Sequence, residues 1–260
     1  MKLKEKCENL IENGVIFENN SGCQFKVVDY VKGVGVIVQF LGTGYKTTAQ
    51  LGNVLRGSVR DRLKPSVCGV GVVGIEVTRI DGKQTKEYEL WNSMLTRCYN
   101  IKIKQNIPTY KHCEVCENFK YFTNFKEWCN NQVGFNSKDD KGNSFQLDKD
   151  ILVKGNKIYS EDTCCFVPCE INNLFTKSNS VRGTYTIGVS RHEQTGKFHA
   201  RVNISGEMTH LGLFETEIEA FTVYKQVKEA YIKHLAEKWK ASLDARVYNS
   251  LIEYNVEITD

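Results

Sequence analysis

The sequence predicts an α+β protein built from several small segments that follow one another along the chain. Residues 23–42 contain β-branched and aromatic runs separated by glycines, which favour short strands and turns. Residues 88–100 repeat apolar side chains at helical spacing, and the C-terminal third contains three strand-like runs before a long helical pattern. We expect a β-rich module (1–75), a mixed segment (76–180), a sheet-and-helix segment (181–240) and an acidic extension (241–260).

The first segment opens with a polar helix, MKLKEKCENLIENG, and continues as a series of short strands. CQFKVVDYV and VGVIVQFLG predict two strands, TGYKTTAQ predicts a third and GSVRDRL a fourth. Short strands with glycine turns favour a small SH3-like barrel or an open sheet. Modules of this kind often bind nucleic acid or protein, and the alternative is a docking or spacer module; the pattern leaves these roles open.

A glycine-rich run, CGVGVVG, closes this segment and matches G-x-G-x-x-G at Gly69, Gly71 and Gly74. A dinucleotide site needs a helix that opens from such a turn, so that the helix N-terminus meets the pyrophosphate. The following residues, IEVTRIDGKQTKEYELW, instead predict a strand and a turn. We therefore expect a flexible linker here and no cofactor.

Composition says more about the cellular location of the protein than about its function. The mean hydropathy is −0.40, and no apolar run approaches the ~18 residues that a membrane helix needs. The N-terminus lacks the apolar core and cleavage site of a signal peptide, so we expect a cytoplasmic protein without membrane contact. The ten cysteines are then expected to be reduced thiols. A net charge of +4 permits nucleic-acid binding but does not require it.

The mixed segment begins with an amphipathic helix and an aromatic-rich stretch. The apolar face of the helix consists of Leu90, Trp91, Met94, Leu95 and Cys98. In YKHCEVCENFKYFTNFKEWCNN we expect the aromatic side chains to form core, with Phe122, Phe125 and Cys129 on one helical face. LDKDILVKGNKIYS (147–160) then sets two acids around a lysine before a glycine turn and the start of a helix. On residues alone, this stretch is either a metal site or an acidic surface turn.

The sheet-and-helix segment has the clearest pattern. Strand-like runs are joined by turns at Gly196 and Gly206. In KFHARVNI one face carries Phe198, Ala200, Val202 and Ile204, and the other carries Lys197, His199, Arg201 and Asn203. The helix begins at Thr216 with Glu219 as its capping-box partner. Its apolar face, Ile218, Phe221, Tyr224, Tyr231 and Leu235, should cover the apolar side of the sheet. The open side is either a major-groove reader or a solvated sheet face.

GVSRHEQTGKFHARV, HLGLFET and EAFTVYKQVKEAY resemble, over about fifty residues, the AP2-type DNA-binding domain. The resemblance implies a three-stranded antiparallel sheet on one helix and double-stranded DNA as the partner, contacted in the major groove. By position it puts the DNA-contacting side chains at Arg182, Arg191, Lys197, His199, Arg201 and His210. The family's aromatic partner to arginine in the third strand is not evident, because His210 stands near it. The base preference therefore stays open.

LWNSMLTRCYN, TYKHCEVCENFKYFTNFKEW and LDKDILVKGNKIYSEDTCCFVPCEIN resemble the HNH and endonuclease VII-like homing endonucleases that are common in bacteriophages. These proteins often carry an AP2-type domain at the C-terminus. The resemblance implies a ββα-metal centre with Mg²⁺ or Mn²⁺, and a location in the cytoplasm of an infected bacterial host. It assigns the metal-binding carboxylate to Asp148 and the helix amide to Asn172, or alternatively to Asn173.

Lys149 occupies the position where this family has its general-base histidine. Imidazole has a reference pKa of about 6.5 and accepts a proton near pH 7, whereas a lysine ammonium, at about 10.4, does not. Loss of a general base costs on the order of a hundredfold to ten-thousandfold in rate. Three expectations remain. The first is an endonuclease with full or weakened activity. The second is a catalytically inactive nucleic-acid-binding protein with a regulatory or counter-defence role, which acts through DNA or through a host protein partner bound at residues 1–75. The third is a pure protein-interaction module, which is favoured if the sheet face of residues 197–210 is occluded.

A second metal hypothesis concerns the thiols. Cys113 and Cys116 have the C-x-x-C spacing of a structural zinc knuckle, and Cys164 and Cys169 could complete four ligands. The related nuclease fold sometimes carries such a zinc. The alternative is a set of buried, reduced cysteines, because aromatic and apolar residues surround each of them.

Overall fold

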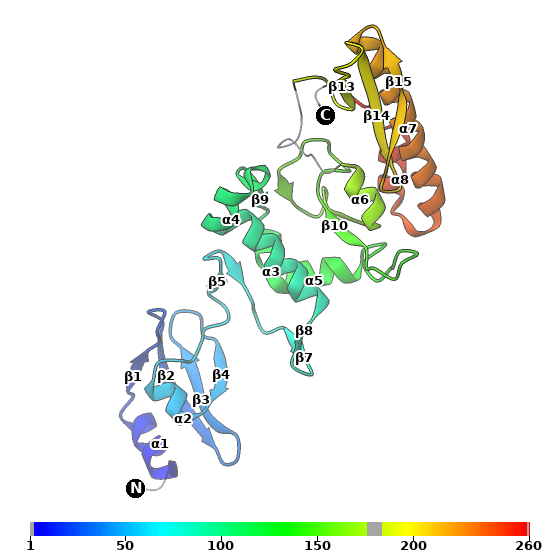
Figure 1. Cartoon of the computed structure of the whole chain (residues 1–260). Helices are drawn as coiled ribbons and strands as arrows, with labels where there is room; N and C mark the ends of the chain where they lie inside the picture. The colour runs from blue at the N-terminus through cyan, green and yellow to red at the C-terminus, as the bar shows by residue number, and fades with distance from the viewer. Residues whose placement is uncertain (1–2, 176–183, 259) are drawn as a thin grey trace. The chain divides into compact units, whose positions relative to one another are not determined.

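The computed structural model describes residues 3–175, 184–258 and 260 (Figure 1). The chain forms two compact units, Met1–Lys126 and Glu127–Asp260. The protein is a mixed α and β structure with a three-stranded antiparallel sheet near the C-terminus, as the sequence predicts. Within the described residues, no helix is both long enough and apolar enough to cross a membrane.

The first unit contains most of the short elements. They are α1 (Leu3–Glu12), β1 (Ile16–Glu18), β2 (Gln24–Val31), β3 (Gly35–Phe40), β4 (Lys46–Ala49), α2 (Leu51–Leu55), β5 (Pro65–Val67), β6 (Gly71–Val72), β7 (Arg79–Ile80), β8 (Lys83–Gln84), α3 (Lys86–Tyr99), α4 (Ile101–Asn106), η1 (Pro108–Tyr110), β9 (Glu114–Val115) and η2 (Asn118–Lys120). Helix α5 (Phe122–Asn130) begins in this unit and ends in the second.

Strands β1 to β4 form an open antiparallel sheet in chain order. Its buried face carries Phe25, Val27, Val36, Val38 and Phe40, at alternate positions of β2 and β3. Helix α1 buries Cys7 against this core. The sequence therefore predicts the two central strands and β4 correctly. Of the two predicted forms, a barrel and an open sheet, the structure has the open sheet.

The predicted strand at 57–63 is wrong. The Asn19 side chain donates to the Val59 carbonyl (2.9 Å), and the Asn20 amide donates to the Gly57 carbonyl (2.9 Å). These bonds hold the segment against the β1–β2 turn instead of in a strand ladder. The fourth strand is β1, whose three residues are too few to show an alternating pattern.

The glycine-rich run is an ordered turn and not a flexible linker. It joins β5 to β6, and no helix opens from it. A Cβ on Gly71 would lie 2.4 Å from Leu95 Cδ1 and 2.9 Å from Trp91 Cη2. This glycine therefore lets the backbone approach helix α3, which explains the residue without a phosphate ligand.

The aromatic stretch forms the core around α3 and α5, as predicted. Trp91, Phe119, Phe122 and Phe125 are fully buried, and Trp91 Nε1 donates to the Phe119 carbonyl (2.7 Å). Tyr121 differs, with 49 % of its surface exposed, and Tyr110 is only half-buried.

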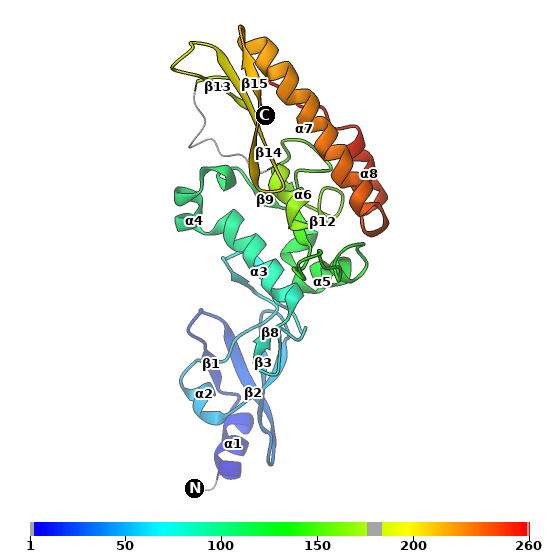
Figure 2. The ribbon, with the colours of Figure 1, turned by 45° about the vertical axis from the view of Figure 1, so that its right-hand side comes forward.

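The second unit contains the remaining elements. They are β10 (Gln146–Asp148), β11 (Ile158–Tyr159), β12 (Cys165–Val167), α6 (Cys169–Leu174), β13 (Val189–Arg191), β14 (Phe198–Ile204), β15 (Glu207–Phe214), α7 (Glu217–Trp239), η4 (Lys240–Ser242) and α8 (Ala245–Ile252). Strands β13, β14 and β15 form the antiparallel sheet in chain order, and α7 runs along it (Figure 2).

Helix α7 begins as predicted. The Thr216 hydroxyl accepts from the Glu219 amide (3.2 Å), and the Glu219 carboxylate accepts from the Thr216 amide (3.0 Å). Phe221, Tyr224 and Leu235 are buried, but Ile218 is 72 % exposed, so its predicted place in the apolar face is wrong. Ile218 lies in the first turn of the helix, where the apolar stripe has not yet begun.

Helix α7 also binds the segment that precedes the sheet. Lys238 Nζ lies 2.7 Å from the Glu170 carboxylate, the Trp239 indole donates to the same carboxylate, and the Phe145 and Trp239 rings are 5.6 Å apart. The structure thus groups residues 127–175 with the C-terminal sheet, whereas the sequence pattern suggests separate segments at 76–180 and 181–240.

Candidate functional sites

The segment with the predicted metal site folds as two paired strands followed by a helix. β10 and β12 are antiparallel, with Asp148 opposite Cys165, and α6 begins directly after Pro168. Asp148 ends β10, and the loop that follows contains β11. The expected helix after Gly155 is absent; Ile158–Tyr159 is extended instead. Asp148 and α6 therefore belong to one small motif, which consists of a strand, a loop, a second strand and a helix. We call this motif the Asp148 element.

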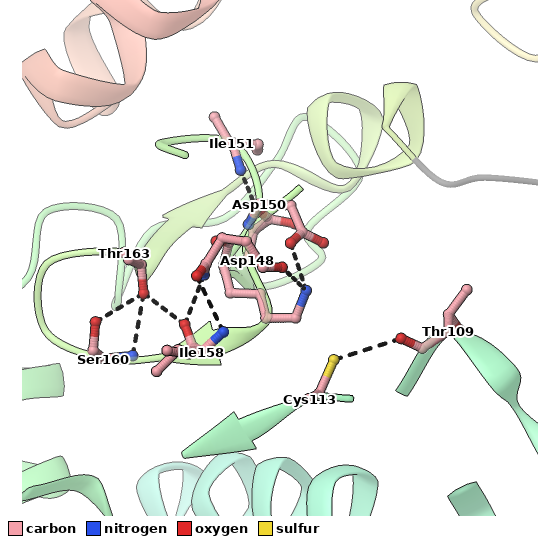
Figure 3. A network of polar contacts seen from close by, with 10 residues as sticks. Thr109, Cys113, Asp148, Asp150, Ile151, Ile158, Ser160 and Thr163 are labelled. Carbon is pink, nitrogen blue, oxygen red and sulfur yellow. Dashed lines mark hydrogen bonds and ion pairs between the residues drawn. The ribbon is translucent and has the colours of Figure 1, made fainter. Parts of the chain in front are cut away.

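Asp148 is half-buried and holds the start of its own loop. Its Oδ1 accepts the backbone amides of Asp150 (2.7 Å) and Ile151 (2.8 Å), as Figure 3 shows. Burial raises the pKa of the Asp148 carboxyl, while the two backbone amides act in the opposite direction. The repulsion from Asp150 also raises this pKa and exceeds the opposing effect of Lys149. The hydrogen bonds and Lys149 therefore do not fully offset the effect of burial on the charged form of Asp148.

Lys149 is a buried structural residue. It is 5 % exposed, and its ammonium donates to Asp150 Oδ1 (2.5 Å) and to the Asn156 carbonyl (3.1 Å). It also lies 5.7 Å from the centre of the Tyr159 ring. The Asn156 side chain closes the loop from the other end, because its Nδ2 donates to the carbonyls of Lys149 (2.8 Å) and Ile158 (2.7 Å).

Two further contacts stiffen the same loop. Thr163 Oγ1 donates to the Ile158 carbonyl (2.7 Å) and accepts from the Ser160 amide (3.2 Å), which Figure 3 also shows. Lys154 reaches the C-terminal segment, where its Nζ lies 2.8 Å from Asp260 Oδ1. The loop after Asp148 is thus tied to itself and to residues at the end of the chain.

Asn172 lies on α6 and reaches β10. Its Nδ2 donates to Gln146 Oε1 (2.7 Å), and Gln146 is two residues before Asp148 on the same strand and therefore on the same side. The neighbouring Asn173 turns elsewhere and donates to Cys169 Sγ (3.4 Å). Of the two predicted amides, Asn172 is the one directed at the strand that carries Asp148.

A magnesium ion at Asp148 and Asn172 stays a prediction for metal analysis. The hydrogen bonds to Asp148 within the described chain are to Oδ1, so Oδ2 is the oxygen available to a cation. Mg²⁺ binds commonly through one or two protein groups and keeps several waters, and its charge would offset the burial of this carboxylate. Residues 3–175, 184–258 and 260 contain no cluster of three or more His, Cys, Asp or Glu that could hold a metal ion.

The four predicted zinc ligands have other contacts. Cys113 Sγ donates to the Thr109 carbonyl (3.5 Å), and Cys116 Sγ accepts the Phe119 amide (3.4 Å). Cys169 Sγ accepts from Gln146 (3.5 Å), and Cys164 is fully buried. These contacts match the alternative of structural thiols, and zinc stays a prediction for metal analysis.

The second candidate site is the open face of the C-terminal sheet. Ala200 and Val202 of β14 are buried on the α7 side, while Arg201 and Asn203 point the other way and are exposed. The strand register places His210 beside Arg201, and Ser190 beside His199. Arg201 donates to the Ser190 hydroxyl (3.2 Å). Arg201, His199 and His210 are thus brought together, as the sequence predicts.

One of the predicted contact residues lies on the other side of the sheet. Arg191 is paired with Phe198 and its guanidinium is 5.6 Å from that ring, so it shares the side of Phe198 and not that of Arg201. Its predicted place on the open face is therefore wrong. Lys197 forms an exposed ion pair with Glu215 (2.5 Å). Arg182 lies outside the described residues.

A β-bulge shapes this face in a way that the sequence did not show. The register shifts between Ala200 and Arg201, and this shift brings His210 and Leu213, three residues apart on β15, to the same side. Sequence analysis also missed His192, whose ring centre lies 6.2 Å from that of His199. The sequence could have indicated His192, because it lies in the turn before Gly196, next to the strand that carries His199.

No family model matches this chain, and neither a curated protein nor a solved structure matches it.

Proposed function

We propose that this chain is a double-stranded DNA-binding protein related to HNH homing endonucleases. In this proposal the open face of β13–β15 contacts DNA, and the Asp148 element keeps a nuclease scaffold without an efficient general base. The observation that carries the proposal is the sheet face. Arg201, His199 and His210 are grouped on the side that α7 does not cover.

The face has the chemistry that duplex DNA requires. Arg201 is exposed and can donate to a phosphate or in a bidentate manner to guanine, and histidine and asparagine can contact base edges or phosphates. Lys197 adds a cation at the end of β14. Its ion pair with Glu215 is exposed, so the pair contributes at most about 1 kcal/mol and yields readily to a phosphate.

The catalytic role depends on Lys149. An ammonium that donates to a carboxylate and a carbonyl has no lone pair with which to take a proton from water. When bound, Mg²⁺ at Asp148 and Asn172 would stabilise the charge that develops on a phosphate. In the described part of the Glu127–Asp260 unit, the histidines are His192 in the turn after β13, His199 and His210 on the sheet, and His234 on α7, and none lies within residues 127–175. We therefore propose that cleavage is weak or absent.

A binding titration tests the proposal. The full chain is titrated into a labelled random-sequence duplex at several salt concentrations, in chelator and in Mg²⁺. We expect binding whose logarithm falls linearly with the logarithm of salt concentration. The matched variants are Arg201→Ala, on the open face, and Arg191→Ala, on the other side of the sheet. If the duplex is not bound, or if both variants weaken binding equally, the proposed interface is wrong.

A further inference from the structure

Two histidines on the open face contact each other directly. His199 Nε2 and His210 Nδ1 form a hydrogen bond, and the two ring centres are 4.2 Å apart. Only one of these facing nitrogens can carry a hydrogen, because two N–H groups cannot point at each other at hydrogen-bond distance. The pair therefore has one bridging N–H, which joins a donor ring to an acceptor ring.

Among the described residues, the titratable groups that act on His199 are cationic or neutral side chains. Arg201 and His192 are the other groups that act on His199, and Ser190 lies beside it in the register. The carboxylates at the margins are Glu193 in the turn, Glu207 at the far end of β15 and Glu215, which binds Lys197. Helix α7 covers the opposite side of the sheet and presents no group to this face.

These contacts define the response to acid. The first added proton goes to the outer nitrogen of the ring that donates the bridging hydrogen, and it leaves a charge-assisted hydrogen bond. The second must go to the acceptor nitrogen, so the rings have to separate. Burial, followed by His210 and Arg201, lowers the pKa of His199, so its charge appears below the usual histidine range.

We propose that the His199–His210 pair makes DNA binding by this face depend on pH, because acidification adds positive charge to the pair beside Arg201. This inference rests on the proposed function, because it assumes that DNA occupies the face. A nearby phosphate would favour the protonated rings, and by linkage the protonated rings would favour the phosphate.

The experiment measures affinity for the same random-sequence duplex at about pH 7.5 and about pH 5.5, at one ionic strength. Uptake of one proton on binding changes affinity by up to about tenfold per pH unit. We expect the wild type to bind roughly five- to thirtyfold more tightly at the lower pH. The double variant His199→Gln, His210→Gln should change by no more than about threefold.

Two controls isolate the pair. His234→Gln removes an exposed histidine of α7 and should keep the wild-type response. In the free protein, the ring proton resonances of His199 and His210 should titrate together in two steps, and each should change when the other residue is replaced. Independent single-step titrations would overturn the inference without any reference to DNA.

The outcomes separate the inference from the proposed function. Binding that is equally tight at both pH values overturns only the inference. Absence of binding at both values overturns the proposed function and, with it, the pH dependence. A wild-type response that survives in the double variant assigns the effect to another group and also overturns the inference.

Discussion

The Asp148 element and the open face of the C-terminal sheet use their polar side chains in opposite ways. Around Asp148, the lysine, both asparagines and the carboxylate are bonded to their own strand, loop or helix. On the sheet, Arg201 and His210 are exposed. Arg201 also donates to Ser190, and His210 is bonded to His199, but these hydrogen bonds are exposed and leave the side chains available to a partner. The hydrogen bonds around Asp148 are part-buried and stabilise the shape of the loop. The comparison favours binding over catalysis.

The largest expected effect is on the exposed face. Arg201→Ala should weaken binding to duplex DNA by about 1–3 kcal/mol, or roughly tenfold to a hundredfold, because it removes a donor to a base or phosphate. Lys197→Ala should have a smaller effect and lower the salt dependence by about one phosphate contact. Fluorescence anisotropy at several salt concentrations measures both.

Arg191→Ala is the matched control for these two substitutions. The guanidinium of Arg191 lies against Phe198, on the other side of the sheet, so we expect DNA affinity to change by less than about twofold. An effect as large as that of Arg201→Ala would mean that the open face is not the contact surface.

The next effect concerns the buried lysine. Lys149→Met should lower the free energy of unfolding by about 1–3 kcal/mol, since hydrogen bonds to a charged group are lost inside the loop. Asp150→Asn is the control. The Asp150 side chain is 43 % exposed, so water replaces much of what its charge contributes, and we expect a loss below about 1 kcal/mol. Urea unfolding curves compare the variants. Equal losses would show that Lys149 is not the anchor of the loop.

The smallest expected effect is on stability at Asp148, where two substitutions distinguish the hydrogen bonds of the side chain from its charge. Asp148→Ala should cost about 1 kcal/mol, because the amides of Asp150 and Ile151 lose their acceptor. Asp148→Asn keeps an acceptor oxygen and removes a buried charge, so it should be at least as stable as the wild type at pH 7.

The pH dependence of this variant has a defined sign. Burial raises the pKa of Asp148 in the folded state, so the native protein binds more protons than the unfolded chain between the two pKa values. Wild-type stability should therefore rise relative to Asp148→Asn as pH falls through the folded-state pKa. Thermal unfolding of both proteins at several pH values measures this difference in stability. The opposite slope would indicate a cationic partner for the carboxylate.

Much of this arrangement could be predicted from local patterns. The apolar faces of α3 and the capping box of α7 are confirmed because both depend on residues three or four positions apart. The alternation in β14 also predicts which side chains are buried. These signals work because helix and strand periodicities are local properties.

Other features depend on contacts between distant residues. The burial of Lys149 follows from Asn156 and Tyr159, and its neighbouring acids alone could equally belong to an exposed turn. The displacement of Arg191 follows from the register of β13, and the meeting of His199 with His210 from a bulge. The joining of residues 127–175 to the C-terminal sheet depends on Glu170 and Trp239, 69 residues apart.

The central claim is that this chain binds DNA but does not cut it efficiently. The direct test is a plasmid nicking assay at protein concentrations that saturate binding, with Mg²⁺ and separately with Mn²⁺. We predict that supercoiled DNA is bound and remains intact through a prolonged incubation in both metals. Metal-dependent nicking that disappears in Asp148→Ala and Asn172→Ala would contradict the claim and identify an active nuclease centre.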